Sequence, residues 1–328
     1  MRILIAPLNW GLGHASRCVP LVRKYLAEGH SVVLGGDGES FILLRKTFPT
    51  LEYVHFPEMH LRYSSGKSQT GAMLRNMPRI LFSLLKDHLH TKYLASHEHF
   101  DLIISDNRFG MFPPKNRTHK DTRYVYITHQ LHIPMPCGWE WMSKIADKLH
   151  KTIWCRYDEV WVPDYSDEKE SLAGKLSHPA TISEKVRYIG PLSRMEKSQE
   201  SVSQYDVVAV LSGIEPQRSM LEEELTKQYA GKSEEVLIVR GKTGESNVKI
   251  HHGNITKIAY MSDGELIPIL NGAKKIICRS GYSSIMDLAR LGMLEKAELI
   301  PTPGQPEQEY LARYIQQKKN TNRPSPQD

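Results

Sequence analysis

The chain has 328 residues, of which 40% are hydrophobic and 24% are charged, the composition of an ordinary soluble globular protein. This length exceeds the usual size of one hydrophobic core, so we expect two domains. The net charge of +6 and the pI near 8.9 suit an anionic partner, but they do not choose among a sugar nucleotide, an acidic membrane surface and nucleic acid.

The cysteines and the apolar segments exclude several classes of protein. The 4 cysteines are scattered without a C-x-x-C pair, which argues against structural zinc and fits a reducing cytoplasm. No apolar run approaches the roughly 18 residues that would span a bilayer. The first residues lead directly into a strand, so we expect no signal peptide and a cytoplasmic location.

The first half of the chain alternates apolar strands with polar loops and helical segments. A helix is expected over residues 19–26, ended by Glu28 and Gly29. Strands are predicted at residues 2–6, 31–34, 51–56, 101–105, 124–128, 159–162 and 186–189. This succession of βαβ units predicts a parallel sheet of six or seven strands.

Residues 72–97 form a long candidate helix that Pro78 interrupts or restarts. Its apolar face alternates with Arg and Lys, a pattern typical of a helix lying on an anionic membrane. An outer helix packed on the sheet has the same pattern, and we favour that interpretation. The preceding loop, residues 62–69, is polar and is expected to be mobile.

The pattern restarts after Gly190 and Pro191. Further strands are predicted at residues 206–211, 236–239 and 255–260, with helices at 216–229 and 264–270. The predicted fold class is therefore α/β with two doubly wound, Rossmann-like domains. We place them at residues 1–192 and 193–318, followed by a polar tail at 319–328 that is expected to be disordered.

The stretch from Ile276 to Ala312 carries the clearest pattern. An apolar run stops at Arg279-Ser280-Gly281 and a helix follows, so a phosphate could approach the free N–H groups and positive dipole end of that helix. Ser283 and Ser284 add hydroxyl donors. Asp287 follows Ser280 by two helical turns, about 10 Å, and could face a ribose; alternatively it is a capping acid for Ser284.

This stretch resembles the nucleotide-sugar half of GT-B glycosyltransferases, in particular the enzymes that add N-acetylglucosamine to lipid I and the UDP-glycosyltransferases. The resemblance implies two Rossmann-like domains facing across a cleft, with the donor bound by the second. Glu309 stands where a Gln is commoner, and Ala312 replaces a usual Asn, which leaves the donor sugar open. The family's last helix, which returns to the first domain, is not evident. The implied donor contacts are Arg194, Ser212, Gly213, Tyr260, Met261, Ser280, Gly281, Tyr282, Ser283, Ser284, Asp287, Gln308 and Glu309.

In open α/β sheets ligands gather beyond the carboxyl ends of the strands. His14 follows the first strand and could take a proton from an acceptor hydroxyl, while Asp106 could orient its ring. The pair resembles the His–Asp pair of UDP-glycosyltransferases. Alternatively His14 contacts a diphosphate or caps a helix, and Asp106 forms an Asx-type cap. Further candidates for a phosphate or acceptor loop on this rim are Gly11, Gly13, Asn107 and His129.

Three motifs resemble those of other classes of protein, and we do not assign those functions. The G-x-G beginning at Gly11, with Asp37 after the second strand, resembles a dinucleotide fingerprint, but a dehydrogenase would leave the second half unexplained. The Gly-Lys-Ser and Gly-Lys-Thr tripeptides at residues 66–68 and 241–243 lack the earlier glycine of a P-loop. His88, His90, His97 and His99 are spaced wrongly for one metal ion on a helix.

The resemblance implies a metal-independent, inverting hexosyltransferase that uses a UDP-sugar donor. The helix dipole and Arg194 would serve the diphosphate, and no Asp-x-Asp tripeptide occurs. We expect no metal, no cofactor and no nucleic-acid partner. The acceptor is a hydroxyl compound, with a lipid-linked molecule and peripheral contact with the inner membrane as one alternative. A UDP-sugar epimerase or hydrolase and a non-catalytic nucleotide-sugar-binding protein are the rival functions.

Overall fold

The structure is a computed structural model that describes residues 1–9, 11–57, 69–136, 138–213, 215–242 and 245–322, with backbone alone for 69–78, 80 and 322. The loop predicted to be mobile lies mostly outside these residues. The chain divides into two compact units, Met1–Arg194 (unit 1) and Met195–Asp328 (unit 2). The sequence placed this boundary two residues earlier. None of the described helices is long and apolar enough to cross a membrane.

Unit 1 is built on a parallel sheet of 7 strands in the order β3-β2-β1-β4-β5-β6-β7, so the predicted sheet is confirmed. Most of its central residues are fully buried, as expected for parallel strands covered on both faces. The strands are β1 (Arg2–Pro7), β2 (Ser31–Gly36), β3 (Glu52–His55), β4 (Leu102–Asp106), β5 (Arg123–Ile127), β6 (Glu159–Val162) and β7 (Val186–Tyr188).

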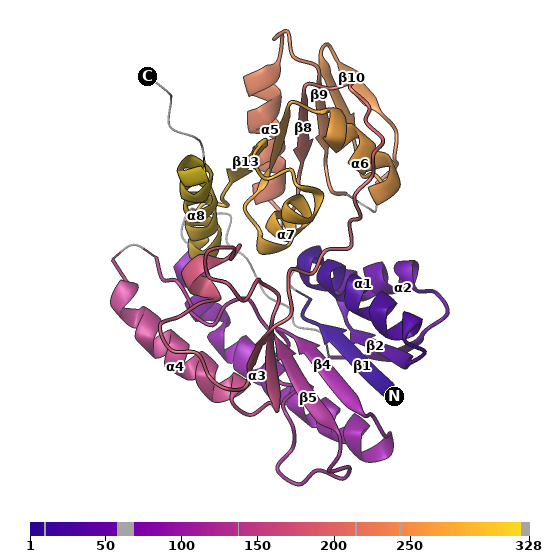
Figure 1. The fold of residues 1–328 in the computed structure, drawn as a ribbon, viewed down its shortest axis with the longest axis vertical. Coiled ribbons are helices and arrows are strands. Elements are labelled where there is room, and N and C mark those ends of the chain that lie inside the picture. The colour runs from indigo at the N-terminus through magenta and orange to yellow at the C-terminus, as the bar shows by residue number, and fades with distance from the viewer. Residues whose placement is uncertain (10, 58–68, 137, 214, 243–244, 323–328) are drawn as a thin grey trace. The chain divides into compact units, whose positions relative to one another are not determined.

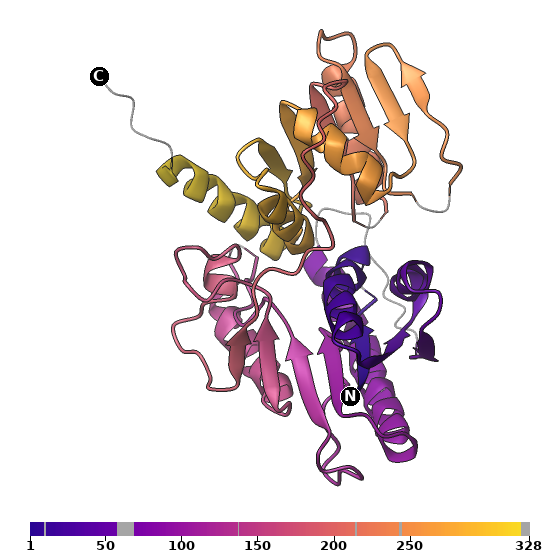
Figure 2. The same cartoon turned by 45° about the vertical axis from the view of Figure 1, so that its right-hand side comes forward.

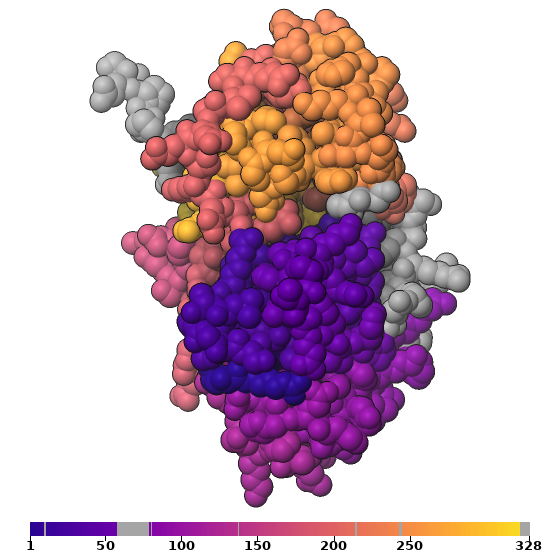
Figure 3. Space-filling view, turned by 90° about the vertical axis from the view of Figure 1, so that its right-hand side faces the viewer, coloured from indigo at the N-terminus to yellow at the C-terminus, as the bar shows by residue number. Residues whose placement is uncertain are grey.

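Helices cover both faces of this sheet (Figure 1). One face is covered by α3 (Gln69–His97) and α4 (Ser143–Trp154). These helices contribute Leu94, Ala95 and Trp154 to the core cluster on that face. The other is covered by α1 (Leu12–Ala27) and α2 (Gly38–Thr47), whose indigo and purple surface faces the viewer in Figure 3. Short 3₁₀ turns lie at Glu140–Met142 (η1) and Gly174–Leu176 (η2). Neither α2 nor α4 was predicted.

The long helix α3 differs in part from its prediction. It runs from Gln69 through Pro78 without interruption, so the predicted break is wrong. Proline removes only one intrahelical hydrogen bond, and packing of the remaining turns can outweigh that loss. Leu94 and Ala95 are buried against the sheet, which confirms the outer-layer packing that we favoured.

Unit 2 contains a sheet of 6 strands in the order β10-β11-β9-β8-β12-β13, with only β10 antiparallel among the described strands (Figure 2). The predicted strand, turn and helix after residue 276 are confirmed as β12 and α7. The elements are β8 (Val207–Val210), α5 (Gln217–Tyr229), β9 (Val236–Val239), β10 (Ile250–His252), β11 (Ile255–Ile258), α6 (Asp263–Gly272), β12 (Lys275–Arg279), α7 (Tyr282–Leu291), β13 (Ala297–Ile300) and α8 (Pro306–Asn322).

The prediction of a disordered tail from residue 319 is wrong for the residues that belong to α8. This helix continues to Asn322, whereas the sequence placed a disordered tail from residue 319. The side chain of Lys319 is 6% exposed and donates to the main-chain oxygen of Ala297. Packing of the last turn against unit 2 therefore outweighs its polar composition.

The strand orders define one switch point in each unit, where neighbouring strands connect in opposite directions. In unit 1 it lies between β1 and β4, and in unit 2 between β8 and β12. Loops that leave the carboxyl ends of strands diverge there, and doubly wound proteins bind ligands in the resulting space. Unit 1 carries His14 and Asp106 at its switch point, and unit 2 carries Gly213 and Gly281.

Candidate active site

The candidate base His14 lies in the first turn of α1, directly after the loop that leaves β1. Gly11 precedes that helix with φ of 76°, a left-handed conformation that glycine adopts without steric cost. Asp106 ends β4, and its pairing with Pro7 of β1 brings it beneath the start of α1. As a result His14 Nδ1 lies 2.9 Å from Asp106 Oδ1.

Arg17 is the functional candidate that the sequence analysis missed. It lies one turn after His14 on α1, is 2% exposed, and donates from Nε to Asp106 Oδ2 at 2.5 Å and from Nη2 to Oδ1. This bidentate, charge-assisted pairing holds the carboxylate in one orientation. Its Nη1 also lies 3.3 Å from Nδ1 of His129. The spacing of three residues from His14 was the available signal, because residues i and i+3 share a helix face.

The charges around Asp106 keep it ionised although it is fully buried. Burial raises the pKa of this carboxyl, but the charges and hydrogen bonds of Arg17 and His14 outweigh that effect, and its pKa lies well below the usual range. Burial lowers the pKa of His14 and the Arg17 charge lowers it further, against the opposing effect of Asp106. The imidazole is therefore neutral at pH 7, the form that can accept a proton.

The proton on the His14 ring has two possible positions. Nδ1 lies 2.9 Å from Asp106 Oδ1 and also 2.9 Å from Arg17 Nη2, and one nitrogen cannot donate to the first and accept from the second at once. A proton on Nδ1 satisfies the carboxylate and leaves Nε2 as the base. Because the ring is 15% exposed, a small part of it is open to solvent.

The other predicted residues of unit 1 have different surroundings. Asn107 has φ of 54°, and its Oδ1 accepts a hydrogen bond from the Tyr126 hydroxyl at 2.8 Å, so this amide is used inside the fold. His129 is 4% exposed and contacts Arg17. A Cβ on Gly11 would meet no described atom within 4 Å. The backbone at Gly11 is thus more open than the Asn107 and His129 side chains.

The switch point of unit 2 consists of main chain and small side chains. Gly281 is the N-cap of α7 with an extended conformation, and a Cβ there would meet no described atom within 4 Å. Ser283, Ser284 and Asp287 are half-buried on the first turns. Next to β12, the strand β8 ends before Ser212 and Gly213, which are exposed. These features fit an anion site at a helix N-terminus.

Three of the predicted donor contacts have structural partners, and a fourth is buried. Ser280 is fully buried and its hydroxyl donates to the main-chain oxygen of Gln308 at 2.8 Å. Gln308 Oε1 accepts from the backbone N–H of Thr302, and a carboxylate oxygen of Glu309 accepts from that of Gly304. Tyr282 is 3% exposed. The sequence could not show the contact of Ser280, because Gln308 is 28 residues away. The contacts of Gln308 and Glu309 close a local turn, where side-chain bonds to the backbone leave no clear pattern in the sequence.

The remaining donor candidates lie at the ends of other elements. Tyr260 is 38% exposed after β11, with its backbone N–H bound to Asn247 Oδ1. Met261 packs against the core of unit 2. Arg194 is half-buried at the end of unit 1, and its main-chain oxygen accepts from Arg23. Of these three residues, Tyr260 is the most exposed.

The look-alike motifs have explanations within the fold. Asp37 is 2% exposed and pairs with Arg108 at 2.6 Å, so its carboxylate is bound inside unit 1 and does not face a ribose. Arg108 also pairs with Asp87 at 3.0 Å. The rings of His88 and His90 pack on Phe112 and Phe56, with centroids 4.0 and 4.9 Å apart, where they fill space.

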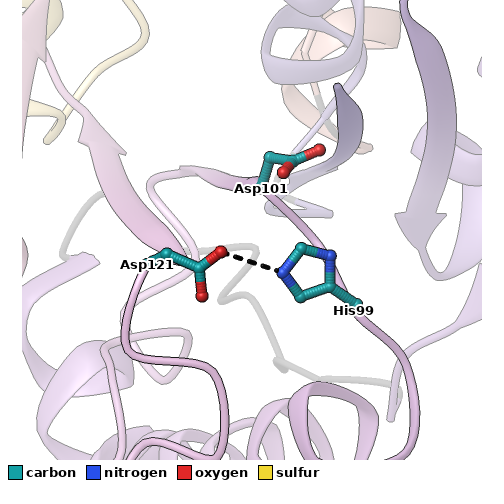
Figure 4. A group of neighbouring side chains, drawn as sticks. All are labelled: His99, Asp101 and Asp121. Carbon is teal, nitrogen blue, oxygen red and sulfur yellow. Dashed lines mark hydrogen bonds and ion pairs between the residues drawn. The ribbon is translucent and has the colours of Figure 1, made fainter.

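One group of metal-type ligands occurs among the described residues. His99, Asp101 and Asp121 place their ligand atoms within 4.8 Å of one another, and Figure 4 shows the His99 and Asp121 side chains facing each other. Asp101 accepts the backbone N–H of Arg2 at 2.6 Å. The group precedes β4 and β5, at the sheet edge opposite His14. Surface ion pairs of this kind are common without a metal, and this trio carries no metal assignment.

Comparisons with known proteins bear on the class and the fold of this chain. No family model matches the chain. Curated relatives include an uncharacterized glycosyltransferase of Methanosarcina acetivorans, 28% identical over 65% of this chain, and one of Methanosarcina mazei, 22% identical over 97% of it. The matches span 55% of the first relative and 84% of the second. Both relatives are described as glycosyltransferases, which supports that class for this chain.

Solved structures show the fold. The glycotransferase of kitacinnamycin aligns over 96% of this chain and 84% of its own, with a TM-score of 0.65 and 13% identity. The spinosyn rhamnosyltransferase, in complex with thymidine diphosphate, aligns over 98% of this chain and 90% of its own, with a TM-score of 0.56 and 13% identity. The chain therefore has the GT-B fold of two Rossmann-like domains.

Proposed function

We propose that the chain is an inverting glycosyltransferase that moves a hexosyl group from a nucleoside diphosphate, UDP in the first instance, to a hydroxyl acceptor. The observation that carries the proposal is the 2.9 Å contact of His14 Nδ1 with Asp106 Oδ1 at the switch point of unit 1. The fold and the glycosyltransferase descriptions of the curated relatives support the same reaction class.

Unit 1 supplies the base in this proposal. With its Nδ1 proton directed at Asp106, His14 takes the acceptor's hydroxyl proton on Nε2. The acceptor oxygen forms a bond to the anomeric carbon as the bond from that carbon to the diphosphate breaks, and the diphosphate leaves with both electrons. Asp106 stabilises the resulting imidazolium, and Arg17 keeps Asp106 ionised and oriented.

Unit 2 binds the leaving diphosphate in this proposal. The N-terminus of α7 offers main-chain donors at Gly281 and hydroxyls at Ser283 and Ser284, and its dipole favours negative charge. Asp287 faces the ribose. The buried hydroxyl of Ser280 is excluded from direct contact, because it is bound to Gln308. Dipole and backbone donors stabilise the leaving group without requiring a metal ion.

Two rival functions predict different features. A UDP-sugar epimerase or hydrolase would need several carboxylates around the sugar, and Glu309 is bound to a backbone N–H of its own loop. A non-catalytic binding protein would have no use for a neutral imidazole held by a buried carboxylate. The curated relatives' descriptions also favour transfer over both.

The acceptor is assigned only as a hydroxyl compound. In its fuller form, the proposal has a lipid-linked acceptor and a cytoplasmic enzyme in peripheral contact with the membrane. The basic net charge of +6 agrees with this form. Nucleic acid is not part of the proposal.

The test is turnover of UDP-sugars by the protein and by His14→Ala. We expect UDP release that depends on an added acceptor, and a fall in kcat of about two to four decades in the variant with UDP affinity nearly unchanged. His97→Ala, at an exposed histidine of α3, is the matched control and should keep full activity.

Three outcomes would contradict parts of this proposal. Equal activity of His14→Ala would remove the assignment of the base. Inversion at C2 of the sugar without acceptor would indicate an epimerase. Binding of UDP-sugars with neither reaction, across a panel of lipid-linked and water-soluble acceptors, would favour a binding protein.

A further inference from the structure

The outward face of α3 is apolar, which is the reverse of the usual arrangement for a surface helix. Five large hydrophobic residues on this helix are 51% to 60% exposed: Leu81, Phe82, Leu85, Leu89 and Tyr93. At 3.6 residues per turn they fall within an arc of about 120°. The helix thus has a continuous apolar stripe in contact with solvent.

The side of α3 that faces the sheet is the more polar one. Ser83, Asp87 and Thr91 are buried there, with Leu94 and Ala95 in the last turns. These residues lie about 170° around the helix from the exposed stripe. Asp87 pairs with the buried Arg108. The packing of α3 is therefore satisfied on its inner side, and the apolar stripe is not needed for the fold.

A second apolar stripe lies on η1 and α4. Trp139 and Trp141 are 47% and 66% exposed, and Ile145 and Leu149 on α4 are 49% and 62% exposed. The sheet-facing residues of α4 follow these two by five positions, about 140° around the helix; they are His150 and Trp154. This helix also turns large apolar side chains toward solvent.

The two helices cover the same face of the sheet. His88 of α3 stacks on Phe112 with ring centroids 4.0 Å apart, and Arg156, just after α4, lies 4.5 Å from the centroid of the same ring. His150 of α4 packs on the nearby Phe109. We call the nine exposed apolar residues together the α3/α4 surface: Leu81, Phe82, Leu85, Leu89, Tyr93, Trp139, Trp141, Ile145 and Leu149.

Basic residues border this surface. Lys86 lies 4.6 Å from the ring centroid of Phe82. The acidic side chains of residues 79–98 and 138–156 are fewer. Asp87, Glu98 and Asp147 are held by Arg108, Arg2 and His132, and the exposed Glu140 accepts the backbone N–H of Gly138. The exposed basic residues of the two helices and their ends are Arg79, Lys86, Lys92, Lys144, Lys148, Lys151 and Arg156.

We infer that the α3/α4 surface binds an anionic lipid bilayer. Exposed apolar patches of this extent mark binding surfaces, and tryptophan and tyrosine prefer the boundary between headgroups and acyl chains. Lysines around them add attraction to anionic headgroups. A second copy of this chain is a poorer occupant, because it would bring two basic borders together. The inference deepens the proposed peripheral membrane contact by naming its surface, and it rests on that surface and not on the assignment of the base.

The test is sedimentation of the full chain with lipid vesicles, without donor or acceptor, so that its outcome is independent of catalysis. We expect binding to vesicles of phosphatidylcholine with phosphatidylglycerol, weaker binding to phosphatidylcholine alone, and weakening by salt. Trp141→Gln with Leu149→Gln, and separately Phe82→Gln with Leu89→Gln, should each reduce binding about tenfold or more. Lys144, Lys148 and Lys151 changed together to Gln should reduce it roughly a hundredfold, about fivefold per lysine.

Ile42→Gln is the matched control, because Ile42 is 53% exposed on α2, on the other face of the same sheet. It should bind vesicles like the unchanged protein. Equal binding by the α3/α4 variants, or no binding by the unchanged protein to either vesicle, would overturn the inference. Light scattering tests self-association. If the unchanged protein is a dimer and the α3 and α4 substitutions convert it to a monomer, the surface binds a second copy of the chain and the inference is overturned.

Discussion

The switch points of the two units are built from different chemical groups. In unit 1 three ionisable side chains, His14, Arg17 and Asp106, contact one another, and two of them are buried. In unit 2 the corresponding position has main-chain N–H groups at the start of α7 and the small side chains around Gly281. A buried charged network can tune a pKa, whereas a helix end offers fixed partial charges to an anion.

This difference separates the expected effects of substitution. Changes in unit 1 should alter the rate, its pH dependence and the stability, because they change which groups are charged. Changes in unit 2 should alter donor affinity, because the helix end carries no group that titrates near neutral pH. Substitutions in each unit test this distinction.

Arg17→Gln should have the largest effect on stability. It leaves the carboxylate of Asp106 buried without its cation, and breaking such a pair costs about 3 to 5 kcal/mol. Burial then raises the pKa of Asp106 without opposition from Arg17. Because a proton removes the buried charge, the loss of stability should be smaller at acidic pH than at neutral pH. Urea unfolding of both proteins at several pH values measures this trend.

The same variant should shift the pH profile of catalysis. The Arg17 charge lowers the pKa of His14, so removing it should raise the pH at which kcat/KM falls on the acidic side. Lys24→Gln makes the same charge change on α1 at a residue whose side chain is 65% exposed, and it should move neither property. A profile unchanged by Arg17→Gln would show that Arg17 does not act on the base.

Gly281→Asp should have the next largest effect, and on affinity alone. A Cβ at this position meets no described atom within 4 Å and the backbone is extended, so the fold accepts the side chain. Aspartate is a favourable N-cap, and the melting temperature should not fall. A negative charge beside the diphosphate should nevertheless weaken UDP binding about tenfold or more, as measured by calorimetry.

Gly281→Asn separates the charge from the size of the new side chain. Asparagine is as good an N-cap as aspartate, and it carries no charge. It should therefore retain most of the UDP affinity. Equal affinity of Gly281→Asp and the unchanged protein would mean that the diphosphate does not bind at the start of α7.

Much of the fold could be predicted because its signals are local. Contiguous residues determine the apolar strands and the turn at Arg279-Ser280-Gly281. The strand order follows from repeated βαβ units. The helix α2 was missed because it has little apolar periodicity. The helix α4 has a clear helical period that was not recognised, and its outward apolar face, with Ile145 and Leu149, was not foreseeable. A pattern that places apolar residues outward cannot be distinguished by sequence from one that places them inward.

The candidate site could be predicted only in part, for a related reason. His14 and Asp106 were found because the first lies just after the loop that leaves a strand and the second ends a strand. Arg17 was missed because its partner Asp106 is 89 residues away, and its spacing from His14 places it on the same helix face without showing that it is buried. Ser280 was assigned to a phosphate because its hydroxyl partner, the main-chain oxygen of Gln308, is 28 residues away.

Ser280→Ala is the smallest of the expected effects and tests that correction. The hydroxyl donates a hydrogen bond to the main-chain oxygen of Gln308, and losing it leaves a half-buried carbonyl with one partner fewer, which costs about 1 kcal/mol of stability. UDP affinity should stay within about twofold, because the fully buried hydroxyl does not reach a ligand. Ser283→Ala is the comparison, since it should weaken UDP binding several-fold, by roughly 1 kcal/mol, and leave stability nearly unchanged. A loss of affinity in Ser280→Ala equal to that in Ser283→Ala would return Ser280 to the phosphate site and would mean that the first turn of α8, which holds Gln308, moves when the donor binds.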